Sequence, residues 1–162
     1  MTIEIGTILE QNASMIAEYT VLNRSIVATG SGTITEIDIS VKVQVTGLII
    51  AIFQEVSPNR FTARSSQAIG TLAPGIHNDV AVSLAVEAGD FIGCYYGAGE
   101  LYSISVGYDD IMYVAGDETE CVNIEFAALA DDAIYLYGTG PEAAVGGGQG
   151  GPAALLVAQG QI

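Results

Sequence analysis

Regular alternation of apolar and polar side chains over residues 37–45 constrains the fold of this chain more than any other feature. Isoleucine or valine occupies every second position, with an acid, a serine, a lysine and a glutamine between them. Successive side chains of a β-strand point to opposite faces, so such a segment buries one face and exposes the other to water. The pattern therefore predicts an amphipathic β-strand.

Most of the remaining sequence also has the character of β-strands. Residues 48–53 are apolar throughout, as expected of a central strand covered on both sides or bordering a partner. Weaker patterns occupy residues 3–9 and 15–22, and no amphipathic helix is indicated. Strands and turns that alternate at spacings of about ten residues are typical of an antiparallel sandwich or barrel. The other strand-like runs are residues 80–86, 91–96, 101–106, 111–115, 121–127 and 134–137.

The C-terminal segment has a different composition. Half of the fourteen residues at positions 138–151 are glycine, which is typical of a flexible linker. We therefore divide the chain into a β-sandwich domain at residues 1–137 and an extended Gly-rich tail at residues 138–162.

An apolar peptide, residues 153–158, follows this glycine-rich stretch. It would either remain a frayed tail or dock on its own body or on a neighbouring subunit, for instance as an added strand. In the second case Leu155, Leu156 and Val157 are the expected interface residues.

The formal charge of −15 is distributed unevenly along the chain. All four lysine and arginine residues lie in the first 64 positions, whereas residues 65–162 contain thirteen acids and no lysine or arginine. Binding to nucleic-acid phosphates or to anionic lipid depends on basic side chains. We therefore expect neither nucleic acid nor a membrane as a partner. The acidity fits solubility and repulsion between copies, or alternatively a cation-binding surface.

No set of residues that would form a catalytic site is evident. His77 is the one histidine, and it reads as a loop residue beside turn residues. The chain contains no Gly-x-Ser-x-Gly motif whose serine could act as a nucleophile with it. Cys94 and Cys121 lie in strand-like runs, where we expect two buried free thiols, although one disulfide is the alternative. One histidine and two cysteines do not make a standard zinc site. The sequence predicts a protein that is not an enzyme.

Pairs of acids occur in several predicted turns. If the strands connect as successive hairpins, Asp109, Asp110, Asp131 and Asp132 emerge at one end of the fold. Calcium prefers six to eight oxygen ligands, which such loops could supply, although none has EF-hand spacing. These four aspartates are the candidate calcium ligands, and ordinary solvated turns are the alternative. We expect no other cofactor.

The chain has eight tyrosines and no tryptophan. Exposed tyrosines stack on sugars or anchor protein interfaces, while buried ones pack in the core. Tyr108 and Tyr135, beside the acidic turns, are the candidate glycan contacts, with core packing as the alternative.

One segment resembles known proteins. Val86-Glu87-Ala88-Gly89-Asp90-Phe91-Ile92-Gly93-Cys94-Tyr95-Tyr96 is similar to a strand–turn–strand unit of jelly-roll modules in phage virion proteins and bacterial surface proteins. Its Ala-Gly-Asp turn is also similar to one in the trimeric heads of complement C1q and tumour necrosis factor. The resemblance extends over about residues 32–137. It implies a two-sheet jelly-roll sandwich, a homotrimer, and a role in assembly or adhesion without catalytic residues.

These observations favour a non-enzymatic structural subunit of a homomeric assembly, most simply a phage capsid decoration, head-fibre or tail protein. Charged residues make up only 14% of the chain, and neutral surfaces of this kind are often covered by other subunits. Its partner would be itself or another capsid or tail protein. We expect a virion or extracellular location. No secretory signal is apparent, and a virion protein needs none, because virions assemble in the cytoplasm and leave by lysis. The alternatives are a carbohydrate-binding module, calcium-dependent or not, and a subunit of a secreted filament.

Overall fold

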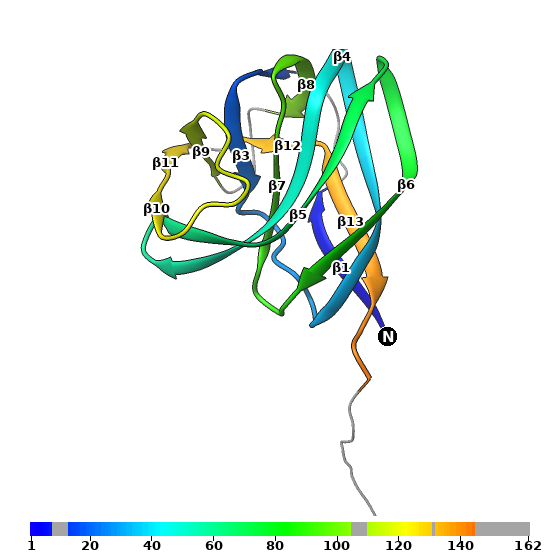
Figure 1. The fold of residues 1–162 in the computed structure, drawn as a ribbon, viewed down its shortest axis with the longest axis vertical. Helices are drawn as coiled ribbons and strands as arrows, with labels where there is room; N and C mark the ends of the chain where they lie inside the picture. The colour runs from blue at the N-terminus through cyan, green and yellow to red at the C-terminus, as the bar shows by residue number, and fades with distance from the viewer. Residues whose placement is uncertain (8–12, 105–109, 131, 145–162) are drawn as a thin grey trace, which may run out of the picture.

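The structure, a computed structural model, describes residues 1–7, 13–104, 110–130 and 132–144. Within these residues the chain forms thirteen antiparallel β-strands and no helix, which confirms the predicted all-β class (Figure 1). No helix long and apolar enough to cross a membrane is found in the described part of the chain. The strands are β1 Thr2–Thr7, β2 Ala13–Ile16, β3 Tyr19–Asn23, β4 Gly32–Ser57, β5 Arg60–Leu72, β6 Gly75–Val86, β7 Phe91–Tyr95, β8 Ala98–Ile104, β9 Ile111–Ala115, β10 Ile124–Glu125, β11 Ala127–Leu129, β12 Ala133–Ile134 and β13 Leu136–Pro141.

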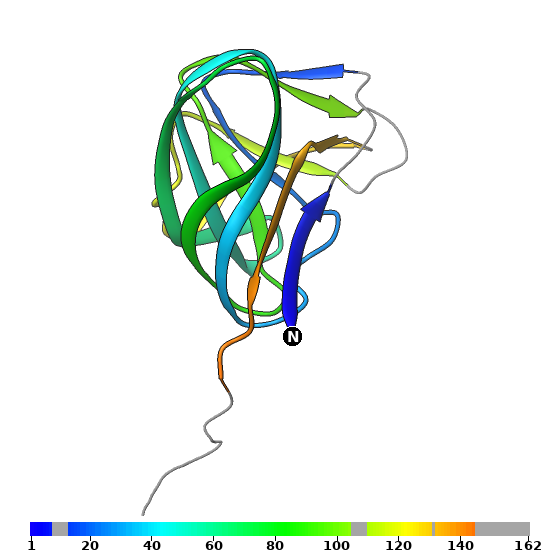
Figure 2. The ribbon, with the colours of Figure 1, turned by 90° about the vertical axis from the view of Figure 1, so that its right-hand side faces the viewer.

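The long strand β4 organises the molecule. It unites the two predicted strands at residues 37–45 and 48–53 in one strand of 26 residues. Its first part pairs with β6, β13 and β8, and its second part pairs with β5 and β7. Gly47, with φ of +64°, lies where the register against β5 shifts between Val45 and Leu48. Such a bulge bends a strand without ending it, so both halves of β4 curve round a common interior (Figure 2).

The bulges also change which side chains of β4 are buried. Ile37, Ile39 and Val41 are buried as the alternation predicts, but Val43 is 47% exposed. The register between β4 and β8 shifts on both sides of Val43. An added residue in one strand reverses the face of the following side chain, which explains why Val43 points outward.

The apolar run at residues 48–53 is a central strand covered on both sides, as predicted. Leu48, Ile50 and Ile52 belong to a large inner cluster with residues of β1, β3, β6, β7 and β13. Ala51 and Phe53 face the opposite way into a second cluster, which Cys121 and Phe126 help to cover. We call this second group the phenylalanine cluster, because it contains all four phenylalanines: Phe53, Phe61, Phe91 and Phe126.

The two cysteines are buried free thiols, in agreement with the sequence-based expectation. Cys94 lies in the inner cluster and Cys121 in the phenylalanine cluster. Burial raises the pKa of the Cys94 thiol from 9.0 to about 12. It likewise contributes most to raising the pKa of the Tyr137 phenol from 10.0 to about 12.

These shifts predict a loss of stability in alkali. Between about pH 9 and pH 12 the unfolded chain releases protons that the folded chain retains, so the free energy of unfolding falls as the pH rises. Urea unfolding at pH 8 and at about pH 11 measures this difference. The variant Cys94→Ala should lose less stability between the two pH values than the wild type, because its thiol contribution is gone. A wild-type midpoint independent of pH would contradict the described burial.

Several segments differ from their sequence-based interpretation. Residues 15–22 form two strands, β2 and β3, because the chain turns at Glu18, whose φ is +72°. His77, interpreted as a loop residue, lies in β6, where its Nε2 is 2.7 Å from the carbonyl of Ala73. Strand β13 continues past the boundary predicted at residue 137 and ends at Pro141.

Close packing, and not flexibility, accounts for the first glycines of the presumed linker. Gly138 pairs with both Ile5 of β1 and Ile37 of β4. A Cβ atom at Gly140 would lie 1.8 Å from the carbonyl oxygen of Thr33. Only glycine allows this approach of two backbones, so composition alone placed the start of the linker too early.

Candidate functional site

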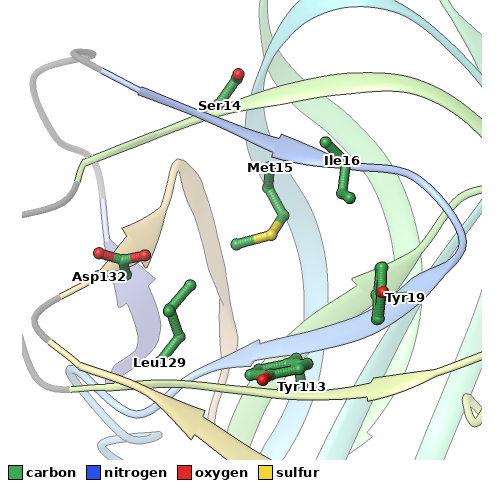
Figure 3. Close-up of a pocket in the computed structure, with 7 residues that line it drawn as sticks. All are labelled: Ser14, Met15, Ile16, Tyr19, Tyr113, Leu129 and Asp132. Carbon is green, nitrogen blue, oxygen red and sulfur yellow. The ribbon is translucent and has the colours of Figure 1, made fainter.

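A surface hollow of about 280 Å³ lies between strand β2 and the edge formed by β9 and β11 (Figure 3). We call it the β2–β11 groove. Its lining combines apolar and aromatic side chains with one carboxylate. The lining residues are Ser14, Met15, Ile16, Tyr19, Tyr113, Leu129 and Asp132.

The floor of the groove continues into the protein interior. Met15, Tyr19 and Tyr113 are partly buried and pack against the inner cluster. The rings of Tyr19 and Tyr113 meet edge to face, with centroids 6.0 Å apart. Ile16 and Leu129, by contrast, are 58% and 42% exposed on the two sides. Figure 3 shows that Met15 and Leu129 extend into the space above the Tyr113 ring.

Strand β2 is held in place from below by the buried Tyr96. The Tyr96 hydroxyl donates a hydrogen bond to the carbonyl of Met15 at 2.5 Å and accepts one from the amide of Leu101 at 3.3 Å. It thereby connects β2 to β8, its one partner strand among the described residues. Burial raises the pKa of this phenol well above 10, so the hydroxyl remains a donor at neutral pH.

The groove lies next to two edge strands. In the part of the chain that the structure describes, β2 pairs only with β8, and β11 pairs only with β9. An edge strand presents backbone N–H and C=O groups to which a further strand can pair. The groove thus offers an apolar floor beside two edge strands.

Two further hollows adjoin the groove and share Tyr19 with it. They add the partly exposed ring of Tyr95 and the acids Glu18 and Glu125. Among the described residues that line the three hollows, none is a lysine or an arginine. The surroundings of the groove are therefore aromatic and acidic.

The predicted calcium ligands lie only partly within the described residues. Asp109 and Asp131 lie outside them. Because Leu129 pairs with Ile111, Asp110 lies at the same end of the β9–β11 pair as the chain that leads to Asp132. No group of three or more histidine, cysteine, aspartate or glutamate side chains that could hold a metal ion is found among the described residues. The calcium site stays a prediction.

The predicted glycan and interface residues lie mostly outside the described residues. Tyr108 and the tail residues Leu155, Leu156 and Val157 lie outside the described residues. Tyr135 is 7% exposed, so its ring offers little surface on which a sugar could stack. Both contacts stay predictions.

Sequence reasoning missed the residues that the groove does bring together. Met15 and Ile16 are adjacent apolar residues in a strand, so one of the two must point away from the core. Ala127, Ala128 and Leu129 are all exposed although all are apolar. These two apolar runs were the signals in the sequence for exposed apolar side chains. Neither run shows that the two strands lie opposite each other.

The described lining contains no histidine, cysteine or lysine, and its polar groups are hydroxyls and one carboxylate. Such a surface suits an apolar or aromatic contact better than nucleophilic or acid–base chemistry. Comparison of the whole chain with known protein families and with curated proteins found no family and no protein that matches it.

Proposed function

We propose that this chain is a non-enzymatic structural subunit of a homomeric assembly, such as a phage capsid decoration, head-fibre or tail protein. The observation that carries the proposal is the apolar groove beside two edge strands, with exposed Ile16 and Leu129 next to it. Exposed apolar side chains that line a hollow are typical of interaction sites. Such an assembly would place the protein on a virion or outside a cell, in contact with itself or with other capsid or tail proteins.

A two-layer jelly roll is the architecture that we propose for the body. The strand pairings support it, since β1, β6, β8, β12 and β13 join the first part of β4 or one another. Strands β3, β5, β7, β9 and β11 form a second group around the other part of β4. The inner cluster draws residues from both groups, as a core between two layers would.

Self-association is the test of this proposal. We expect the purified chain to sediment as a trimer, with three times the 16.7 kDa mass of one chain. Because each copy carries a charge of −15, added salt should screen the repulsion and strengthen association. Analytical ultracentrifugation at low and high sodium chloride measures both effects. A strict monomer under all these conditions would overturn the proposal.

A carbohydrate-binding module is the second candidate. The partly exposed rings of Tyr19, Tyr95 and Tyr113 around acid-rimmed hollows support it, because sugars stack on such rings. A glycan array read with and without EDTA tests this function, and a blank array would remove it. Thermal melting with calcium and with EDTA tests the acidic turns in the same sample, since a bound ion raises the midpoint of the unfolding transition.

A secreted filament subunit would instead form fibres visible by electron microscopy.

A further inference from the structure

We infer that the β2–β11 groove is the docking site for the apolar C-terminal peptide, residues 153–158, of a second copy of this chain. The inference rests on the proposed self-assembly and specifies its contact. The peptide would lie in the groove as an extended strand beside β2. Its sequence, its lack of charge and the length of its tether each support this assignment.

The size and lining of the groove suit a short run of aliphatic side chains. Its volume of about 280 Å³ is at the lower limit of the roughly 300–1,000 Å³ typical of sites for drug-sized molecules. The floor consists of a thioether and two aromatic rings, and Ile16 and Leu129 flank it. Adding a peptide there would cover these two exposed side chains.

Strand β2 would provide the backbone contacts. It has one partner, β8, among the described residues, so an extended peptide could pair with its other edge. Side chains of a strand alternate in direction, which places Leu155 and Val157 on one face and Leu156 on the other. The face with two large aliphatic residues fits the floor, so Leu155 and Val157 would enter the groove and Leu156 would point away.

Charge distinguishes this peptide from the rest of the chain. Asp132 lies in the groove, and Glu18 and Glu125 line the adjoining hollows. An acidic segment of another copy would be repelled there. Residues 143–162 contain no charged side chain, whereas residues 65–142 contain all thirteen acids of the base-free region. The tail can approach this surface without electrostatic repulsion between side chains.

The tether favours the groove of another copy over that of the same chain. The described chain ends at Ala144, near Gly32, whose bridge to Glu142 fixes this end of β4. Strand β8, with which β2 pairs, pairs with β4 only from Val41 onward. Val41 lies about 30 Å from Gly32 along an extended strand. Figure 2 accordingly shows β2, the blue strand near the top, far from the orange end of β13 beside the N-terminus.

Leu155 lies eleven positions beyond Ala144. These eleven steps span at most about 40 Å when fully extended. A Gly-rich chain of this length has a root-mean-square span of only about 17–20 Å. Reaching its own groove round the body would therefore require extension well beyond this average span, whereas a neighbouring copy can place its groove within reach of the tail.

Complementation between two full-length variants tests the inference. The donor variant Leu155→Ser/Val157→Ser has an altered tail and an intact groove. The acceptor variant Leu129→Asp has an intact tail and an added charge at an exposed groove position, and Ile16→Asp repeats the test on the opposite wall. We expect each variant alone to self-associate at least tenfold more weakly than the wild type. An equal mixture should form a heterodimer, because one intact tail and one intact groove remain.

Matched controls separate these effects from general loss of structure. Leu156→Ser changes the same peptide on its other face, and Val122→Asp adds a charge at a position that is 75% exposed and outside the groove. Both should associate within about threefold of the wild type. Thermal melting of every variant confirms that the body remains folded.

The possible outcomes discriminate between the two proposals. A monomeric wild type would overturn the proposed assembly itself. A wild type that associates, with donor and acceptor variants that associate equally well, would leave the assembly and overturn the groove as its contact. Weak variants that fail to complement each other would overturn docking between copies. A glycan signal that Leu129→Asp abolishes without changing association would assign the groove to a sugar instead.

Discussion

Replacing Phe53 by alanine is expected to lower the free energy of unfolding by about 3–5 kcal/mol. Phe53 is fully buried in the second part of β4 and meets the ring of Phe126 edge to face, with centroids 5.9 Å apart. Removing the ring takes away apolar burial and leaves a cavity among side chains held by several strands. Urea unfolding monitored by circular dichroism measures the change.

The same strand supplies the control for this prediction. Val56 lies three residues further along β4 and is 46% exposed, so Val56→Ala should change the free energy of unfolding by about 0.5 kcal/mol or less. A cost for Phe53→Ala below about 1 kcal/mol would show that the phenylalanine cluster is not packed as described. The result matters for the whole fold, because this cluster joins residues 121–126 to the face of β4 that lies opposite the inner cluster.

The strand content of this chain follows from local sequence, but the path of its longest strand does not. Alternation with period two identifies residues 37–45 as a strand, and continuous apolarity identifies residues 48–53 as another. Both patterns reflect which side chains of a strand are buried. The bulges around Val43 and Gly47 depend instead on which strands pair with β4 and in what register. Those partners come from distant parts of the chain, so no local pattern predicts that Val43 is exposed.

The groove could not have been predicted from the sequence either, because it also depends on contacts between distant parts of the chain. Strands β2 and β11 are separated by more than one hundred residues, and each is short. Tyr113 and Tyr135 both lie in strand-like runs rich in apolar residues, yet Tyr113 lines the groove while Tyr135 is buried. The face that each side chain occupies depends on pairing with β3 for Tyr113 and on the start of β13 for Tyr135.

The turn that carries the resemblance to jelly-roll modules has a structural explanation in this protein. Asp90, at the end of the Ala-Gly-Asp turn, accepts two hydrogen bonds from the guanidinium of Arg64 and one from the amide of Glu87. Its own backbone carbonyl accepts a hydrogen bond from Ala28 at 2.8 Å. The aspartate therefore ties the β6–β7 turn to β5 and to the segment before β4. Any fold that needs such a connection favours an acid at this position, which is how the motif can recur in unrelated proteins.

Replacing Asp90 by alanine should consequently destabilise the protein by about 3 kcal/mol or more. The Asp90 side chain is 5% exposed and that of Arg64 is 20% exposed, so the substitution leaves a largely buried guanidinium without its main partner. Hydrogen bonding to Asp90 is also the main cause that raises the pKa of Arg64, which therefore stays charged at any practical pH. Urea unfolding of Asp90→Ala at neutral pH measures the cost.

Two further variants show whether that cost arises from the buried pair. Glu87 contacts the same guanidinium at 3.1 Å but is 63% exposed, so Glu87→Gln should cost about 1 kcal/mol or less. The double variant Arg64→Met/Asp90→Ala removes both charges, and its cost should be smaller than the sum of the two single costs, because no unpaired charge remains. If Asp90→Ala proves no more harmful than Glu87→Gln, the turn is held by its backbone bonds alone. If instead the single costs add, Arg64 and Asp90 stabilise the fold independently, and the proposed connection between β5 and the β6–β7 turn is wrong.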